Sequence, residues 1–571
     1  MNDKQKHKQK HKKGEKREKQ GKREEVLEEI PEEEEEEVEN PPKKKGEQEE
    51  ETEKSIKYKN VKCNDDMSFE ECELTILRSV VDLGTEEQGQ IMVSNPDIKK
   101  MIELLEKWLI EKGCLCYGGT ALNAVLPKNV QFYNRNTEIP DYDFFSPNAL
   151  EDAIELSQYY YKNGFEMIEA KSGVHHGTFK VYVNYIPIAD ITQLEPILFE
   201  NMQKDSIVIA GIHYAPVHFL RLACFTELSR PKGDISRWEK VFKRLTLLNE
   251  YYPLKSAIPC ELVEFQRAMS NHSVTKMSKI RGKKETEITQ ENIYVWTRDI
   301  LIKEGVVFFG GYATSVYATH MSAKDREWVK QIPDFDVLCV DAETCAQNVA
   351  AELKAKGVTG VSVQEHEAIG EIVPRHYQII ILEKETICFV YEPIACHSYN
   401  TVKSNGGKTV KIATIDTMLS LYLAFIYTGK PYFYKERILC MAQYLFEVEQ
   451  ANRLEQKGVL RRFSMECVGK QENLISLRET KARKFRELKK GSAEYTEWFL
   501  KYNPAVDADP LGDAGFGDKK REKGFEKKMG KKGEKRPETH KKKLFRGHRR
   551  HSKTKKYRED KSVFFLSLIH I

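Results

Sequence analysis

Two aspartates, Asp141 and Asp143, stand two residues apart in an apolar, aromatic run. If this run is a β-strand, both carboxylates project from one face. Carboxylate oxygens suit Mg²⁺, which usually takes one or two of them together with phosphate oxygens of a substrate. Asp190 lies at the end of another predicted strand and would add a third carboxylate. The three aspartates therefore predict a divalent-metal site at which a phosphoryl group is transferred.

A glycine pair, Gly118-Gly119, lies between a short predicted strand over 115–117 and a predicted helix. Glycine lets the backbone approach a polyphosphate closely, and the start of a helix offers free N–H groups and the positive end of its dipole. Each signal is weak alone, because an Asp-x-Asp pair is expected on the order of once by chance in a chain of this length. Their ordered combination is more specific and predicts adjacent phosphate and metal sites.

An internal repeat supports this combination. An amphipathic helix over 98–109 precedes the first glycine pair, and a similar segment over 293–301 precedes Gly310-Gly311. The glycine pairs are 192 residues apart, and the Asp-x-Asp pairs, with the second at Asp334 and Asp336, are 193 residues apart. Two copies are too few for a solenoid. We predict two tandem globular domains of the α/β (α+β) class.

The end of the repeat predicts that only one copy is active. The segment 185–190, Tyr-Ile-Pro-Ile-Ala-Asp, aligns with 391–396, Tyr-Glu-Pro-Ile-Ala-Cys, so that Cys396 takes the place of Asp190. A thiol is a poor ligand for magnesium. We therefore predict a catalytically silent second domain that serves structure, RNA binding or dimer contact.

These motifs resemble those of a known superfamily. Gly-Gly followed by Asp-x-Asp and a later Asp is similar to the polymerase-β-like nucleotidyltransferases. The segments 118–123 (GGTALN), 140–145 (PDYDFF) and 229–241 (SRPKGDISRWEKV) resemble the poly(A) polymerase catalytic subunit of large cytoplasmic DNA viruses, of the mimivirus and asfarvirus type. The resemblance extends over about residues 60 to 510.

The resemblance implies a function and a set of site residues. It implies template-independent addition of AMP from ATP to mRNA 3′ ends, with Mg²⁺ or Mn²⁺, in a homodimer that acts in the cytoplasm, in a virus factory or virion. The metal ligands would be Asp141, Asp143 and Asp190. The residues implied in contacting the triphosphate, ATP or the RNA end are Gly118, Gly119, Thr120, Asn123, Arg230, Lys232, Arg237 and Lys240.

Two alternatives stay open at this point. The motifs specify phosphoryl transfer but not the base, so uridylyl or CCA addition would fit equally. A non-catalytic RNA-binding scaffold is a second alternative, motivated by Cys396 and by a basic C-terminal arm.

Charge is unevenly distributed along the 571 residues. Residues 1–23 carry 11 Lys or Arg against 3 acidic residues, residues 24–54 carry 16 Glu against 4 Lys, and residues 519–561 carry 21 Lys or Arg against 6 acidic residues. Segments so poor in apolar side chains cannot offset their ordering entropy, so we predict disordered tails. A basic arm suggests polyanion binding, although a solubilising role explains it equally well.

The predicted boundaries are a charged tail over 1–54, a lead-in over 55–94, the catalytic domain over 95–258, a linker over 259–290, the degenerate domain over 291–450, a helical segment over 451–515, a basic tail over 516–565 and a suspected sequencing-adapter artefact over 566–571. The twelve cysteines show no zinc-ribbon spacing, and we interpret them as reduced intracellular thiols. No apolar run reaches the ~20 residues that span a bilayer. We expect no membrane contact.

Overall fold

A computed structural model describes residues 63–64, 66–263, 288–326, 334–403 and 407–507. The predicted tails, most of the predicted linker and the last residues lie outside this part. The chain divides into two compact units between Leu83 and Gly84. The helix α2 (Phe69–Ser94) begins in the first unit, and apart from the disulfide Cys63–Cys72 everything described below lies in the second.

The first half of the second unit is built on a mixed sheet. Its strands, in spatial order, are β16 (Lys501–Tyr502), β3 (Ile168–Ser172), β4 (Thr178–Val183), β5 (Ile186–Gln193), β2 (Tyr142–Ser146), β1 (Leu115–Tyr117), β7 (Ile212–Tyr214) and β6 (Ile207–Ile209). Its helices are α3 (Pro96–Lys112), α4 (Gly118–Val125), α5 (Ala149–Lys162), α6 (Pro196–Lys204), α7 (Val217–Leu228) and α8 (Trp238–Tyr251).

The second half repeats this plan. Its sheet has the order β10 (Ser362–His366), β11 (His376–Ile381), β12 (Glu385–Tyr391), β9 (Phe335–Leu338), β8 (Val307–Phe309), β14 (Thr409–Ala413), β13 (His397–Lys403) and β15 (Cys467–Val468). Its helices are α9 (Gln290–Glu304), α10 (Gly310–Tyr317), α11 (Ala323–Arg326), α12 (Ala342–Ala355), α13 (Ile415–Phe425) and α14 (Lys435–Ala451). The order of helices and strands is thus similar in both halves, which agrees with the prediction of two domains on one α/β plan.

The helix before the glycine pair shows why the sequence folds this way. Pro96 opens α3, where its missing N–H costs nothing, and the side chain of Asn95 accepts a hydrogen bond from the Asp97 N–H at 2.8 Å. Gly113 ends the helix in the left-handed conformation. The predicted apolar stripe, represented by Trp108, is buried in the core. The end of α3 leads directly into β1 and so fixes the glycine turn that follows.

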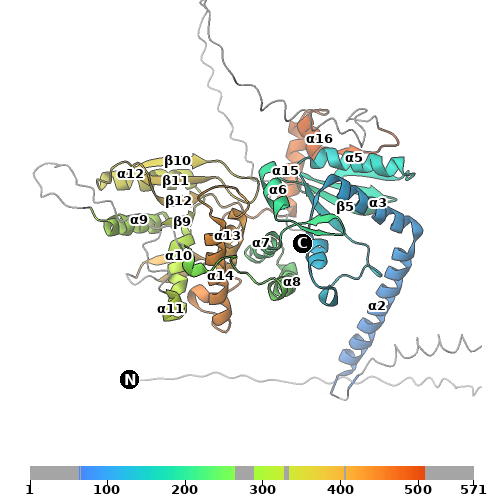
Figure 1. Ribbon diagram of the computed structural model, residues 1–571, viewed down its shortest axis with the longest axis horizontal. Coiled ribbons are helices and arrows are strands. Elements are labelled where there is room, and N and C mark those ends of the chain that lie inside the picture. The colour runs from blue at the N-terminus through green and yellow to red at the C-terminus, as the bar shows by residue number, and fades with distance from the viewer. Residues whose placement is uncertain (1–62, 65, 264–287, 327–333, 404–406, 508–571) are drawn as a thin grey trace, which may run out of the picture. The chain divides into compact units, whose positions relative to one another are not determined.

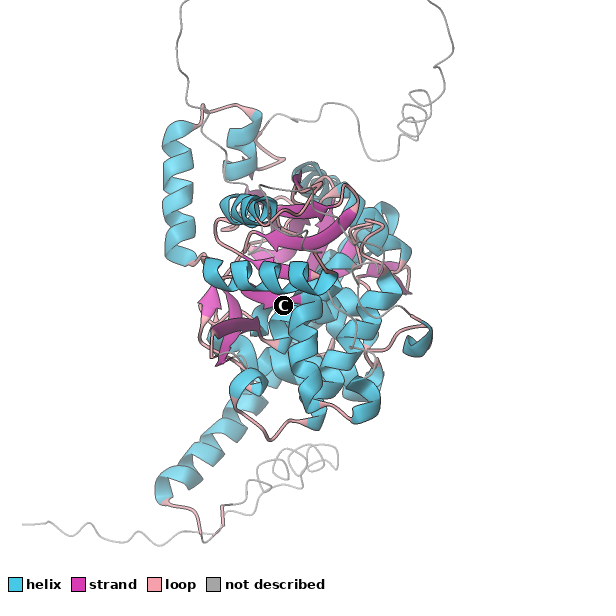
Figure 2. Ribbon diagram, turned by 90° about the vertical axis from the view of Figure 1, so that its left-hand side faces the viewer, coloured by secondary structure: helices cyan, strands magenta, loops and turns pink. Residues whose placement is uncertain are grey.

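Helices from both halves pack between the two sheets. In Figure 1, α7 of the first half lies beside α13 of the second, with α14 next to it, and Figure 2 shows strands covered by helices on both sides. A backbone hydrogen bond of 2.9 Å from Ser398 N to Ser229 O also joins the halves. The C-terminal segment contributes to both sheets, since β15 joins the second and β16 the first, while α15 (Leu474–Glu487) and α16 (Ala493–Phe499) lie between these strands in sequence.

The interpretation of the cysteines as reduced thiols is wrong in part. Three disulfides are present, namely Cys63–Cys72, Cys260–Cys440 and Cys396–Cys467. Their partners are 9, 180 and 71 residues apart. Sequence spacing alone cannot identify the two long-range pairs, because a disulfide needs two Cα atoms within about 7 Å in the folded chain.

In the part of the chain that the structure describes, every helix is too short or too polar to cross a membrane.

Candidate active site

A sharp turn brings the glycine pair against the aspartates. Tyr117 ends β1 in an extended conformation, and Gly118 begins α4 with φ +75°. A β-carbon added to Gly118 would lie 2.6 Å from Oδ2 of Asp143, closer than real β-carbons approach other atoms. Glycine is required at this position for two reasons. Its positive φ disfavours any residue with a β-carbon, and the carboxylate of Asp143 leaves no room for one.

The three predicted aspartates lie on or next to two neighbouring strands in the middle of the sheet. Asp143 and Asp190 are register partners on the parallel strands β2 and β5, and the exposed Asp141 immediately precedes β2. Burial, together with the charges of Asp141 and Asp190, raises the pKa of Asp143 well above its usual range. Lys180 on β4 forms an ion pair with Asp190. The site therefore holds more negative charge than its own side chains balance.

This excess of negative charge fits a divalent cation. Among the described residues, no three His, Cys, Asp or Glu side chains already form a metal-binding group. Lys180 engages the carboxylate of Asp190 in an ion pair. A cation that displaced Lys180 would gain three carboxylates and remove the repulsion that Asp143 experiences.

Two residues predicted near the triphosphate have structural contacts instead. The hydroxyl of Thr120 donates a hydrogen bond of 2.6 Å to the backbone oxygen of Asp141. The side-chain oxygen of Asn123 accepts hydrogen bonds from the N–H groups of Phe132 and Tyr133, at 2.7 and 2.9 Å. Thr120 thus positions the backbone of Asp141, and Asn123 holds the loop that follows α4.

The four predicted basic residues separate into a buried one and three at the surface. Arg230 is only 2% exposed and lies where the halves meet, beside His397. Its burial argues against contact with ATP or RNA, which stays a prediction. Lys232 and Lys240 are exposed. Arg237 lies 3.4 Å from Glu227, and its charge counteracts the rise in the pKa of Asp143. Sequence shows that these residues are basic, but only the packing of α7 against α13 decides which are accessible.

Arg244 is a candidate that the sequence analysis missed. It lies one helical turn after Lys240 on α8, and its guanidinium would be 3.1 Å from a β-carbon added to Gly119. It donates a hydrogen bond of 2.5 Å to the hydroxyl of Tyr133 and lies over the ring of Phe132 at 4.6 Å. The i, i+4 spacing from Lys240 was the available signal. Arg244 is only 4% exposed, like Arg230, but its guanidinium lies against the glycine turn, which makes it a candidate for contact with a phosphate bound there.

A cavity of about 540 Å³ lies beside Asp141. Asp141 and Thr120 line it together with Glu106, Arg135 and Tyr214. Its size suits a nucleotide-sized group, and it opens directly beside one of the three carboxylates.

The second half keeps the turn and loses the third carboxylate. Gly310 has φ +66°, and a β-carbon added to it would lie 2.2 Å from Oδ2 of Asp336. The register partner of Asp336 on β12 is Phe389, which takes the place that Asp190 has on β5. The prediction that Cys396 stands there is wrong, because Cys396 lies beyond the end of β12 and is bonded to Cys467.

Aromatic side chains fill the space next to Asp336. The cavity there is only about 30 Å³, and its lining includes Asp334, Tyr432, Phe433 and Met441. Phe433 stacks on Phe425 of α13 with ring centroids 4.1 Å apart. There is no room for a nucleotide at this place.

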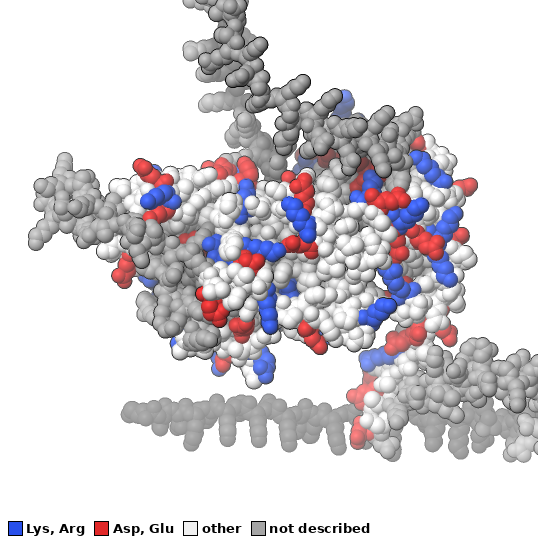
Figure 3. Space-filling model, in the orientation of Figure 1, with Lys and Arg blue, Asp and Glu red and all other residues white. Residues whose placement is uncertain are grey.

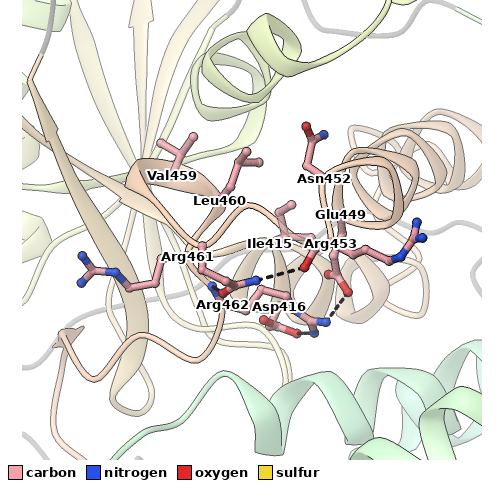
Figure 4. Close-up of a pocket in the computed structure, with 10 residues that line it drawn as sticks. Ile415, Asp416, Glu449, Asn452, Arg453, Val459, Leu460, Arg461 and Arg462 are labelled. Atoms are coloured by element: carbon pink, nitrogen blue, oxygen red, sulfur yellow. Dashed lines mark hydrogen bonds and ion pairs between the residues drawn. The ribbon is translucent and has the colours of Figure 1, made fainter.

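Another cavity of the second half, about 10 Å³, surrounds a buried ion-pair cluster (Figure 4). Arg462 lies between Asp416 and Glu449, with N–O distances of 3.0 and 2.7 Å. Burial, with the charge of Asp416, raises the pKa of Glu449 to about 8. The cluster ties the segment after α14 to α13 and α14, and it is too small to hold a substrate.

Charged side chains of both signs are interspersed over the face seen in Figure 3. That face carries no single large basic field.

A glycine turn against Asp-x-Asp, with a third Asp on the neighbouring parallel strand, defines the nucleotidyltransferase class of fold. Residues 103–234 match the model of a family described as "Poly(A) polymerase catalytic subunit". The resemblance to the viral poly(A) polymerases is therefore confirmed for this segment.

Individual proteins agree with the family match. A putative poly(A) polymerase catalytic subunit of African swine fever virus (isolate Tick/Malawi/Lil 20-1/1983) is 30% identical over 169 residues, which are 28% of this chain and 34% of that protein. The protein with the same description from Acanthamoeba polyphaga mimivirus is 28% identical over 162 residues, which are 28% of this chain and 27% of that protein. The chain thus spans about a third of the length of the viral relatives it matches.

A solved structure extends the likeness of the fold. The crystal structure of the Megavirus polyadenylate synthase superposes with a TM-score of 0.61 and 18% identity. The match covers 78% of this chain and 87% of that one. The predicted α/β fold class is confirmed.

Proposed function

We propose that this protein is a template-independent polynucleotide adenylyltransferase that transfers AMP from ATP to the 3′ end of RNA and releases pyrophosphate. The observation that carries the proposal is the position of Asp143, buried between Asp141 and Asp190 and in contact distance of the Gly118 turn. The family match over 103–234 supports the choice of AMP and RNA.

In this proposal, the glycine turn and the basic residues of α8 would bind the triphosphate. Gly118 and Gly119 let the triphosphate approach the start of α4, whose N–H groups and dipole favour a negative charge. Arg244, with Arg237 and Lys240 nearby, would neutralise the phosphates from the side of α8. Phosphoryl transfer depends mainly on such positioning and charge neutralisation.

The aspartates would hold Mg²⁺ or Mn²⁺. When bound, the cations would lower the pKa of the RNA 3′-hydroxyl and neutralise charge on the phosphates. Asp141, Asp143 and Asp190 would bind them, and Lys180 would have to release Asp190. Thr120 keeps the backbone of Asp141 in place throughout.

The second half would be catalytically silent. Phe389 replaces the third carboxylate and aromatic side chains fill the site beside Asp336. We propose a role in structure for this half, and a homodimer acting in the cytoplasm stays a prediction.

The experiment is labelled-nucleotide incorporation on a single-stranded oligoribonucleotide, with each NTP supplied separately and with Mg²⁺ or Mn²⁺. ATP should be incorporated in preference. Asp143→Asn should lower incorporation by at least about 100-fold, the loss seen when even outer-shell partners of metal sites are removed. Asp336→Asn, the matched change in the second half, should leave incorporation unchanged.

Several results would contradict the proposal. Preference for UTP or CTP would favour uridylyl or CCA addition. Retained AMP incorporation by a folded Asp143→Asn variant would remove the assignment of the site, and the absence of any product from the unchanged protein would favour an RNA-binding scaffold.

A further inference from the structure

Three lysines stand in one row across the sheet that carries the aspartates. Lys180 on β4 is the register partner of Asp190, Lys171 on β3 is the partner of Lys180, and Lys501 on β16 is the partner of Lys171. Register partners project from the same face of a sheet. The lysine row, Lys180, Lys171 and Lys501, therefore continues the line of the aspartates toward the edge of the sheet.

The row is unfavourable for the protein alone. Like charges directly opposite each other on neighbouring strands destabilise a sheet. Asp190 offsets the charge of Lys180, and Glu169 lies 3.2 Å from Lys171. Lys501 is exposed and has no ion pair within the described residues. Such an arrangement is expected where a ligand supplies the missing negative charge.

The second half provides an internal comparison. The positions that correspond to Asp190, Lys180 and Lys171 are Phe389 on β12, Gln378 on β11 and Gln364 on β10. These three residues are register partners in the same order. No lysine occupies these positions. The lysines therefore occur in the half that has three carboxylates and not in the half that has lost one.

The direction of the row separates it from the glycine turn. Across the first sheet the order is Tyr117 on β1, Asp143 on β2, Asp190 on β5 and then the lysine row. Gly118 follows Tyr117, so the triphosphate side and the lysine row lie on opposite sides of the aspartates. With strands about 4.8 Å apart, the row extends about 14 Å from Asp190.

We propose that the lysine row binds successive phosphates of the RNA, so that the strand reaches the aspartates across β16, β3 and β4. This inference rests on the proposed function and names the path of its polymeric substrate. Tyr182, whose ring lies 4.0 Å from the Lys171 Nζ atom and is half-buried, offers a base a place to stack beside this path.

The test is fluorescence anisotropy of a labelled single-stranded oligoribonucleotide over a series of salt concentrations. The variant Lys171→Gln/Lys501→Gln leaves Asp190 and its ion-pair partner Lys180 unchanged. It should bind RNA more weakly. The negative slope of log association constant against log salt concentration should become shallower by about 1.4, or 0.7 for each lost phosphate contact. Its KM for ATP should not change.

A matched control uses a lysine in the same local setting of the second half. Lys411 on β14 lies 5.5 Å from the ring of Tyr399, as Lys171 lies over Tyr182. Lys411→Gln should keep the RNA affinity and the salt slope of the unchanged protein, and Lys171→Arg should keep most of the affinity.

The outcomes are distinct. An unchanged salt slope in the double variant would overturn the proposal that the lysine row binds RNA. AMP incorporation by the unchanged protein would still support the proposed function. A raised KM for ATP with unchanged RNA binding would assign the row to the triphosphate and overturn the proposal. If the unchanged protein extended no RNA, the function would fail separately, and the salt slopes would still decide whether the row binds RNA.

Discussion

The two halves of this protein share a backbone plan and differ along one row of their sheets. In the first half the row contains Asp143, Asp190 and the lysines, whereas in the second it contains Asp336, Phe389 and two glutamines. In both halves a β-carbon added to the glycine of the turn would clash with the neighbouring aspartate, at 2.6 Å from Asp143 and 2.2 Å from Asp336. The turn is thus common to both halves, while the third carboxylate and the lysines are present only in the half for which we propose charged ligands.

The replacement in the second half is favourable for stability. Phe389 is 1% exposed, and its ring stacks with that of Tyr432 at 5.6 Å. An aromatic pair of this kind adds about 0.5–1.5 kcal/mol beyond the burial of its area. The first half instead buries Asp143 against like charges. This burial is unfavourable for stability, and the proposed function gives it a purpose, because charged substrates would be bound there.

The glycine turns offer the sharpest way to separate the halves. Gly118→Ala and Gly310→Ala each force a side chain into a left-handed position and should each lower the free energy of unfolding by about 1–2 kcal/mol or more. Only Gly118→Ala displaces a working carboxylate, Asp143, and a misplacement of about 1 Å reduces rates about 100-fold. AMP incorporation and thermal unfolding of both variants measure this difference.

Equal losses of activity in the two alanine variants would contradict the comparison. They would mean that the second turn also contributes to catalysis, or that activity simply follows overall stability.

Arg244 and its counterpart test the phosphate side of the site. Met441 has the corresponding position on α14 and lines the filled cavity beside Gly311. Arg244→Gln should raise the KM for ATP about tenfold, the lower limit for the loss of a hydrogen bond to a charged group. Met441→Leu should leave the KM unchanged, since such swaps conserve volume. Initial rates over a range of ATP concentrations give both values, and an unchanged KM in Arg244→Gln would remove this residue from the site.

The features that sequence predicted well are local. The helix over 98–109, the turn at Gly118 and the pair Asp141 and Asp143 depend on neighbours in the chain, and periodicity and turn chemistry indicate them directly. Asp190 was predicted at the end of the strand formed by the alternating run, but that run is β4, and Asp190 lies inside the next strand, β5. Its register with Asp143 came only from the structure.

The features that sequence missed are set by packing between distant segments. The similarity of 185–190 to 391–396 pointed to Cys396, but strand register, which sequence similarity does not encode, places Phe389 opposite Asp336. Likewise, Arg230 stands in a basic motif and is buried because the halves meet there. Lys501 is more than 300 residues from Lys171 and Lys180, and only the pairing of β16 with β3 brings it into their row.

The buried carboxylates of the second half allow a pH test of stability. The pKa of Glu449 is about 8 in the folded protein and 4.5 when it is unperturbed. Between these values the folded protein binds a proton that the unfolded chain releases. The free energy of unfolding should therefore fall as pH rises from 4.5 to about 8, by at most about 1.4 kcal/mol per pH unit.

Glu449→Gln removes this titration and keeps the shape of the side chain. Denaturant unfolding at several pH values should show the variant gaining stability relative to the unchanged protein as pH rises through this range, with AMP incorporation unaffected. Glu447→Gln is the matched control, because Glu447 is exposed on the same helix and bonded only to Gln443 at 2.9 Å. If both variants showed the same pH dependence, the cluster around Arg462 would hold Glu449 ionised, and the second half would bury its charge as an ordinary ion pair.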